Sequence, residues 1–135
     1  MQQQSKRRLI YSGSPWEELA GYARAVVDED WIFVSGTLGQ NFETLEFPES
    51  AEAQTELALD HIELALAQVP ASLHDVVRMR VYVASRADVP AVSAVIKRRL
   101  GDTRPANTTV CSQLTIEQAR VEIEVTARLR RGQPQ

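Results

Sequence analysis

Hydrophobic positions along this chain follow two periods, one typical of β-strands and the other of α-helices. The clearest predicted strand covers residues 121–130, where Val, Ile, Ala and Leu alternate with Glu, Thr and Arg. Residues 77–84 alternate in the same way, as expected for strands with one buried face. Two short β-rich runs, residues 22–27 and 31–35, are joined through residues 27–30 and predict a hairpin. Residues 8–12, before the break at residues 13–15, and residues 108–114 are predicted as two further strands.

Two segments have the helical period instead. Residues 50–69 carry an apolar stripe made of Ala58, Ile62, Ala65, Leu66 and Val69, and Pro70 ends the predicted helix. Residues 89–100 carry a second stripe made of Val89, Val92, Ile96 and Leu100. Asp88 is a suitable N-cap for this second helix, and Pro90 is tolerated in its first turn.

The predicted order β-β-β-α-β-α-β-β indicates an α+β fold, with a single mixed β-sheet and two helices packed on one face. We expect one domain over residues 1–135, with an ordered core of about residues 7–131. The other sheet face carries Arg, Glu and Thr. It is too polar for a second core and too regular to be accidental, so either water or another subunit must cover it.

Composition narrows the class of protein. The chain has 135 residues, 44% of them apolar, and a formal net charge of −3. A mildly acidic chain lacks the basic field that non-specific nucleic-acid binding needs. No apolar run approaches the length of a membrane span, the basic start has no apolar segment after it, and a lone cysteine suits a reducing compartment. We therefore expect a cytoplasmic protein that binds neither membrane nor nucleic acid.

Five stretches, taken in order, resemble the reactive-intermediate deaminase (RidA/YjgF) family. They are GYARAV at 21–26, FVSGT at 33–37, DVVRMRVYV at 75–83, RPA at 104–106 and VEIEV at 121–125. Each motif alone is weak, but their order and spacing match the family over most of the chain. The resemblance implies a chorismate-mutase-like fold and a homotrimeric ring, with small-molecule pockets between subunits. It also implies hydrolysis of enamines and imines such as 2-aminoacrylate to a keto acid and ammonia, without a metal or organic cofactor.

The resemblance assigns roles to several residues. Glu122 matches the carboxylate that orients water, and Tyr22, Ser35 and Gly36 match residues that line the pocket. Deaminating members hold the substrate carboxylate with an arginine, because a guanidinium matches its two oxygens. In this sequence Asn107 stands at that position. The loss of a charge-assisted contact corresponds to about one to two powers of ten in affinity, so the resemblance implies a branch without this arginine.

The sequence leaves more than one role open for several other residues of the predicted pocket. Thr109 is predicted to face the same pocket as Asn107 by the strand period, and Cys111 is expected to be buried and inert. Arg24 could supply the missing positive charge, or pair with Glu122 or Glu124 at an interface. Glu122 could equally be a sheet-face carboxylate paired with an arginine. The residues between 38 and 48 form a candidate pocket lid.

Two function classes stay open at this point. One is an enzyme that hydrolyses enamines or imines, and the other is a non-catalytic trimer that binds or senses a small metabolite. Endoribonuclease activity, a third class attached to relatives, is disfavoured by the acidic balance. His61 and His74 lie far in sequence from the predicted pocket strands. Neither has the spacing of metal ligands, so no metal site is predicted.

Overall fold

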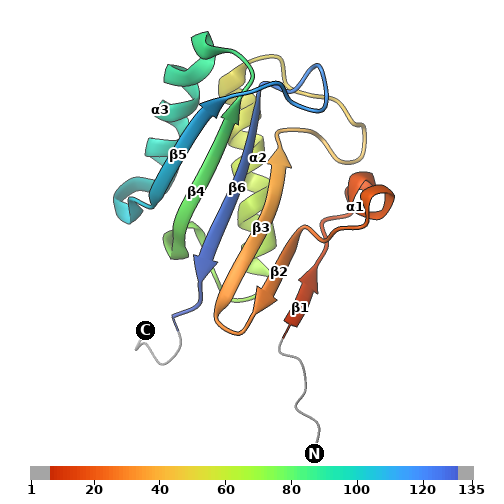
Figure 1. Cartoon of the computed structure of the whole chain (residues 1–135), viewed down its shortest axis with the longest axis vertical. Coiled ribbons are helices and arrows are strands. Elements are labelled where there is room, and N and C mark those ends of the chain that lie inside the picture. Colours follow the sequence, from red (N-terminus) through yellow and green to blue (C-terminus); the bar gives the residue numbers. More distant parts are fainter. Residues whose placement is uncertain (1–6, 131–135) are drawn as a thin grey trace, which may run out of the picture.

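A computed structural model describes residues 7–130 and places six strands in one mixed sheet (Figure 1). The strands are β1 (Arg7–Ile10), β2 (Ala25–Asp28), β3 (Trp31–Leu38), β4 (Val76–Val83), β5 (Ala106–Cys111) and β6 (Val121–Arg128). Their spatial order is β1-β2-β3-β6-β4-β5. β4 and β5 are parallel, and the other neighbouring pairs are antiparallel. The predicted hairpin is β2–β3, and the predicted mixed sheet is confirmed.

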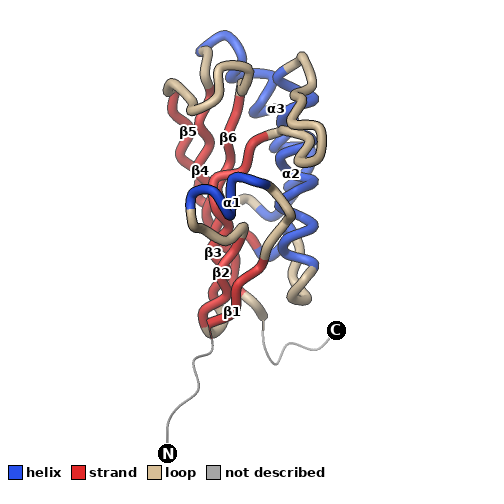
Figure 2. The backbone as a smooth tube through the Cα atoms, turned by 90° about the vertical axis from the view of Figure 1, so that its right-hand side faces the viewer, coloured by secondary structure: helices blue, strands red, loops and turns tan. Residues whose placement is uncertain are grey.

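Two helices cover one face of the sheet, α2 (Ala51–Ala67) and α3 (Val89–Leu100). Figure 2 shows them as a layer beside the strands, while the opposite sheet face stays uncovered. Ser50 caps α2 by accepting a hydrogen bond from the backbone N–H of Ala53. Short 3₁₀ turns at Leu73–Asp75, Arg86–Asp88 and Gly101–Thr103 join the elements around the two helices.

The core lies between these two layers. All five residues of the apolar stripe predicted for α2 are buried, and Val92 and Leu100 of α3 are buried beside them. The inward residues of β6 are Val121, Ile123, Val125 and Ala127, as its alternation predicts. In β4 a register shift between Val76 and Arg78 buries Val76, whereas the sequence pattern had placed Val77 inside. A bulge of this kind changes which residues of a strand face the core, and the alternation of residue types along the sequence does not reveal it.

A third helix, α1 (Pro15–Ala20), lies at the β1–β2 edge of the sheet and was not predicted. Ser14 accepts a hydrogen bond from the Trp16 N–H, Pro15 begins the helix, and Gly21 ends it in the left-handed region at φ 75°. Six residues are too few to show a helical period, so Ser14 and Pro15 indicated only a break after the first strand. That strand, β1, ends at Ile10 rather than at residue 12.

Other predicted boundaries also shift. The first hairpin strand begins at Ala25 rather than at residue 22, and its partner β3 runs on to Leu38. β5 covers Ala106–Cys111 instead of residues 108–114. Residue 131, the predicted end of the core, lies outside the described residues. Within residues 7–130, no helix has both the length and the apolar character needed to cross a membrane.

Candidate functional site

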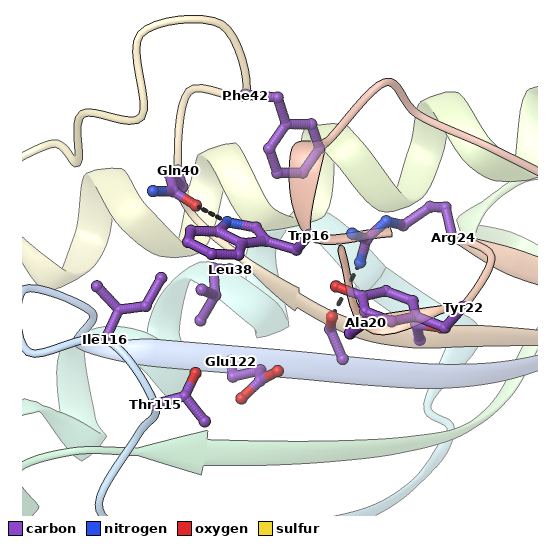
Figure 3. Close-up of a pocket in the computed structure, with 12 residues that line it drawn as sticks. Trp16, Ala20, Tyr22, Arg24, Leu38, Gln40, Phe42, Thr115, Ile116 and Glu122 are labelled. Carbon is purple, nitrogen blue, oxygen red and sulfur yellow. Dashed lines mark hydrogen bonds between the residues drawn. The ribbon is translucent and has the colours of Figure 1, made fainter. Parts of the chain in front are cut away.

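A cavity of about 580 Å³ opens where α1, β3 and β6 converge (Figure 3). Five of the predicted site residues line it. Tyr22 and Arg24 come from the connection between α1 and β2, Ser35 and Gly36 come from β3, and Glu122 comes from β6. The remaining lining residues are Trp16, Ala20, Leu38, Gln40, Phe42, Thr115 and Ile116. Residues that are far apart in sequence therefore meet in one pocket within a single chain.

Gly36 makes room for the carboxylate of Glu122. The pairing of β3 with β6 shifts register between Val34 and Thr37, and this irregularity brings Gly36 against the Glu122 side chain. A Cβ atom on residue 36 would overlap the Glu122 Oε2 atom. The atom that such a Cβ would meet is the end of a side chain, so glycine here leaves room for this position of the Glu122 carboxylate.

Glu122 is a half-buried carboxylate on the pocket side of β6. Within the described residues it makes neither a salt bridge nor a hydrogen bond, so the alternative of a sheet-face ion pair is wrong. Burial raises the pKa of Glu122, the negative charge of Glu124 raises it further, and the positive charge of Arg24 partly opposes both effects. A carboxyl group with a raised pKa in a pocket is suited to accept and return protons.

Arg24 is paired with a residue that the sequence reasoning did not consider. Its Nε atom donates to the Oε2 atom of Glu17 at 3.0 Å, and the two side chains are only 2% and 4% exposed. Its Nη1 atom donates to the Gly36 carbonyl at 2.9 Å and to the Thr37 hydroxyl at 3.1 Å. Within the described chain Arg24 is therefore paired with Glu17 and not with Glu122 or Glu124, while a pair across a subunit interface stays a prediction. Glu124 instead accepts a hydrogen bond from the Tyr82 hydroxyl at 2.8 Å.

Two aromatic rings flank the Arg24 guanidinium. Its central carbon lies 5.6 Å from the centroid of the Tyr22 ring and 5.4 Å from that of Phe42. The Phe42 ring also stacks on His61, with centroids 3.9 Å apart. Burial lowers the pKa of His61, and the nearby positive charge of Arg24 lowers it further, whereas its hydrogen bond to the Gln40 carbonyl and the charge of Asp60 act in the opposite direction.

Gln40 fixes the predicted lid loop to the pocket wall. Its side-chain oxygen accepts a hydrogen bond from the Trp16 indole N–H at 2.9 Å, and its amide donates to the Leu45 carbonyl at 3.0 Å. Gln40 is 2% exposed, so these contacts hold α1 and the loop against each other. The loop therefore forms part of the pocket wall through Gln40 and Phe42.

Asn107 and Thr109 do not line the cavity that contains Glu122. They share a face of β5, where the Thr109 hydroxyl donates to the Asn107 side-chain oxygen at 2.8 Å, and they line a separate cavity of about 300 Å³ against α3. Lys97 and Arg104 line that second cavity as well. Cys111, at the end of the same strand, is exposed rather than buried. A single chain therefore does not bring Asn107 to Glu122.

Several pocket residues were missed by sequence reasoning. Trp16 and Ala20 belong to α1, Gln40 and Phe42 belong to an irregular loop, and Thr115 and Ile116 lie in the connection before β6. The one available signal was an aromatic residue directly after a Ser-Pro helix start. No group of three or more His, Cys, Asp or Glu residues among 7–130 is arranged to hold a metal ion.

Comparison with known proteins identifies the family. A family model described as endoribonuclease L-PSP matches residues 14–129. The 3-aminoacrylate deaminase RutC of Acinetobacter baylyi is 30% identical over 124 residues, which are 90% of this chain and 97% of that protein. The 2-iminobutanoate/2-iminopropanoate deaminase of Dermatophagoides farinae is 29% identical over 89% of this chain and 94% of its own length.

A solved structure agrees with these sequence matches. The crystal structure of a YjgF-family member from Mycobacterium tuberculosis superimposes with a TM-score of 0.83, at 36% identity, over 92% of this chain and all of that one. The chain therefore belongs to the RidA/YjgF family and has its fold. Because the relatives above are named as deaminases, the family's deaminase function is supported.

Proposed function

We propose that this protein hydrolyses a reactive enamine or imine to a carbonyl compound and ammonia, with Glu122 as the group that positions water. The observation that carries the proposal is the unpartnered Glu122 carboxylate, whose pKa is raised and which faces a cavity. The names of the relatives support the same chemistry. No resident cofactor is invoked, since water is the only co-reactant.

The reaction needs one base that later acts as an acid. Glu122 accepts a proton from water as the oxygen bonds to the C=N carbon, and the imine nitrogen, protonated from solvent, takes the electron pair. The resulting carbinolamine then loses ammonia: the C–N bond breaks, the nitrogen takes its electron pair, and the hydroxyl passes its proton to water as it becomes a carbonyl. A raised pKa allows the same carboxyl group to return its proton to the leaving nitrogen.

Other pocket residues would orient the substrate. The Tyr22 ring and hydroxyl border the cavity, and Ser35 anchors the ends of β2 and β3 by donating its hydroxyl to the Ala23 carbonyl at 2.7 Å. We assign Tyr22 to substrate contact, and Ser35 and Gly36 to shaping the space beside Glu122. Arg24 is assigned to the pocket wall, because most of its donors are already engaged.

The replacement of Glu122 by Gln tests this proposal. Glu122→Gln keeps the size of the side chain but removes the base, so hydrolysis of enzymatically generated imines should fall by about 100-fold or more. Ammonia release from those imines is the measurement. Glu117→Gln is the matched control, because Glu117 is an exposed carboxylate in the nearby loop and does not line this cavity. An unchanged rate in Glu122→Gln would exclude the proposed role.

We also propose that the chain works as a homotrimer, with the open sheet face turned toward its neighbours. Leu9, Trp31, Phe33 and Val110 are each at least 40% exposed, and the strand pairing places them on this face. Their combined exposure is typical of an interaction surface. Phe33→Glu should shift the sedimentation of the protein toward that of a monomer, whereas Leu64→Glu on α2 should not. A wild-type monomer at micromolar concentration would contradict the trimer.

A second candidate function is a non-catalytic trimer that binds a small metabolite. The observation in its favour is the position of Asn107, which adds no charge and lies outside the cavity that contains Glu122. This alternative predicts that Glu122→Gln changes ligand affinity and that no imine is hydrolysed faster in the presence of the protein.

A further inference from the structure

The cavity beside Glu122 is mainly apolar and aromatic. Trp16, Leu38, Phe42 and Ile116 line it together with the Tyr22 ring. Figure 3 shows Trp16 and Phe42 on the side of the pocket opposite Glu122. At about 580 Å³, the space is far larger than a three-carbon imine needs. The apolar walls of this space favour a substrate with an apolar body.

The charges around the cavity do not favour an anionic substrate. Arg24 is the one cation that lines it within the described residues, and its charge is balanced by Glu17, itself buried beside it. Two guanidinium nitrogens are already engaged, by Glu17 and by Gly36 and Thr37. A substrate carboxylate would also lie near ionised Glu122, where like charges repel.

A protonated imine is favoured by the same surroundings that disfavour an anion. Its nitrogen carries a positive charge, which attracts the Glu122 carboxylate, while aromatic rings accept both an apolar body and a nearby cation. We infer that the substrate of this pocket is an imine or enamine without a carboxylate, bearing an aromatic or branched aliphatic body. This inference rests on the proposed hydrolytic function and names the substrate class for the same site.

A matched pair of imines tests the inference. A flavin amine oxidase converts 2-phenylethylamine to its imine, and an L-amino-acid oxidase converts L-phenylalanine to 2-imino-3-phenylpropanoate. Both oxidations consume O₂ and release H₂O₂, so H₂O₂ counts the imine formed and ammonia counts the imine hydrolysed. The two imines differ only in the carboxylate. D-Alanine with a D-amino-acid oxidase supplies 2-iminopropanoate, which has the carboxylate without the aromatic body.

We expect the protein to accelerate ammonia release from the phenylethylamine imine most strongly, by about tenfold or more over either carboxylated imine, because a carboxylate that enters the pocket loses its hydration without gaining a charge-assisted partner. Faster hydrolysis of either carboxylated imine would overturn the substrate class and leave the proposed function intact. No acceleration of any of the three imines would overturn the proposed function, and the inference with it.

Variants of the apolar wall give a second readout. Trp16→Ala should raise the KM for the phenylethylamine imine by about tenfold, because a large aromatic contact is lost, with a smaller effect on kcat. Trp16→Phe should restore most of the affinity, and Leu64→Ala, at an exposed position on α2, serves as the control. An unchanged KM in a folded Trp16→Ala protein would contradict the assignment of this wall to the substrate body.

Discussion

The chemistry proposed for this pocket depends on the surroundings of one side chain. Glu122 is half-buried, unpartnered and pressed against Gly36, and its pKa is raised mainly by burial and secondly by Glu124. Glutamates on an open sheet face are usually solvated and ionise in their ordinary range. Glu122 and Glu124 occupy the same face of β6, but Glu124 accepts a hydrogen bond from the Tyr82 hydroxyl, whereas Glu122 has no such bond among the described residues.

Replacing Glu124 by Gln should move the acidic limb of the pH–rate profile to lower pH. The proposed base must be ionised, so activity falls as the pH drops through the raised pKa of Glu122. Removal of the Glu124 charge removes one cause of that rise, while a Gln oxygen can still accept the Tyr82 hydrogen bond. The measurement is kcat/KM against pH for the variant and the wild type. A limb that moves to higher pH would contradict this electrostatic account.

At the scale of elements, the buried pair of Glu17 and Arg24 attaches α1 to the connection that leads directly into β2. Glu17 also accepts hydrogen bonds from the Ser12 backbone N–H and hydroxyl, so its carboxylate is fully satisfied. The pair holds Trp16 over the pocket, and Trp16 in turn bonds Gln40 of the loop. A short helix at the edge of the sheet thus determines one wall of the site.

Glu17→Gln should destabilise the protein by roughly 3 kcal/mol or more, because it leaves a buried guanidinium without its counter-charge. Urea unfolding measures the change in the free energy of unfolding. Glu18→Gln is the matched control, since Glu18 is the next residue of the same helix and is exposed. Equal stabilities of the two variants would mean that the pair contributes little to anchoring α1.

The contrast between α1 and the longer elements shows which parts of the fold the sequence could predict. The long periodic elements, α2, β4 and β6, were predicted because burial imposes a regular pattern on many residues. α1 has only six residues, and the bulges in β3 and β4 change the register without changing the composition. Glu122 was found through a motif, whereas the Glu17 partner of Arg24 depends on a helix that had no detectable period.

At the scale of the whole molecule, the site and the strand that carries Asn107 lie apart. Asn107 lines a cavity against α3 together with Lys97 and Arg104, while the Glu122 pocket opens beside α1. In the spatial order of strands, β5 is one edge of the sheet and β6 is its third strand from that edge. Any contribution of residue 107 to the Glu122 pocket must therefore come from another copy of the chain.

The replacement Asn107→Arg tests whether a neighbouring subunit completes the site. In the proposed trimer, a guanidinium at residue 107 should raise 2-iminopropanoate hydrolysis by about tenfold or more, since it restores a charge-assisted contact with the carboxylate. Mixed trimers distinguish an arginine that acts on the pocket of its own chain from an arginine that acts on the pocket of a neighbouring chain. When Asn107→Arg/Glu122→Gln chains assemble with wild-type chains, the arginine occurs only on chains that lack the base, so a gain in rate requires contact between subunits. An intact mixed trimer without any gain would show that the edge of β5 does not reach the pocket of its neighbour, and each site would then be built from one chain alone.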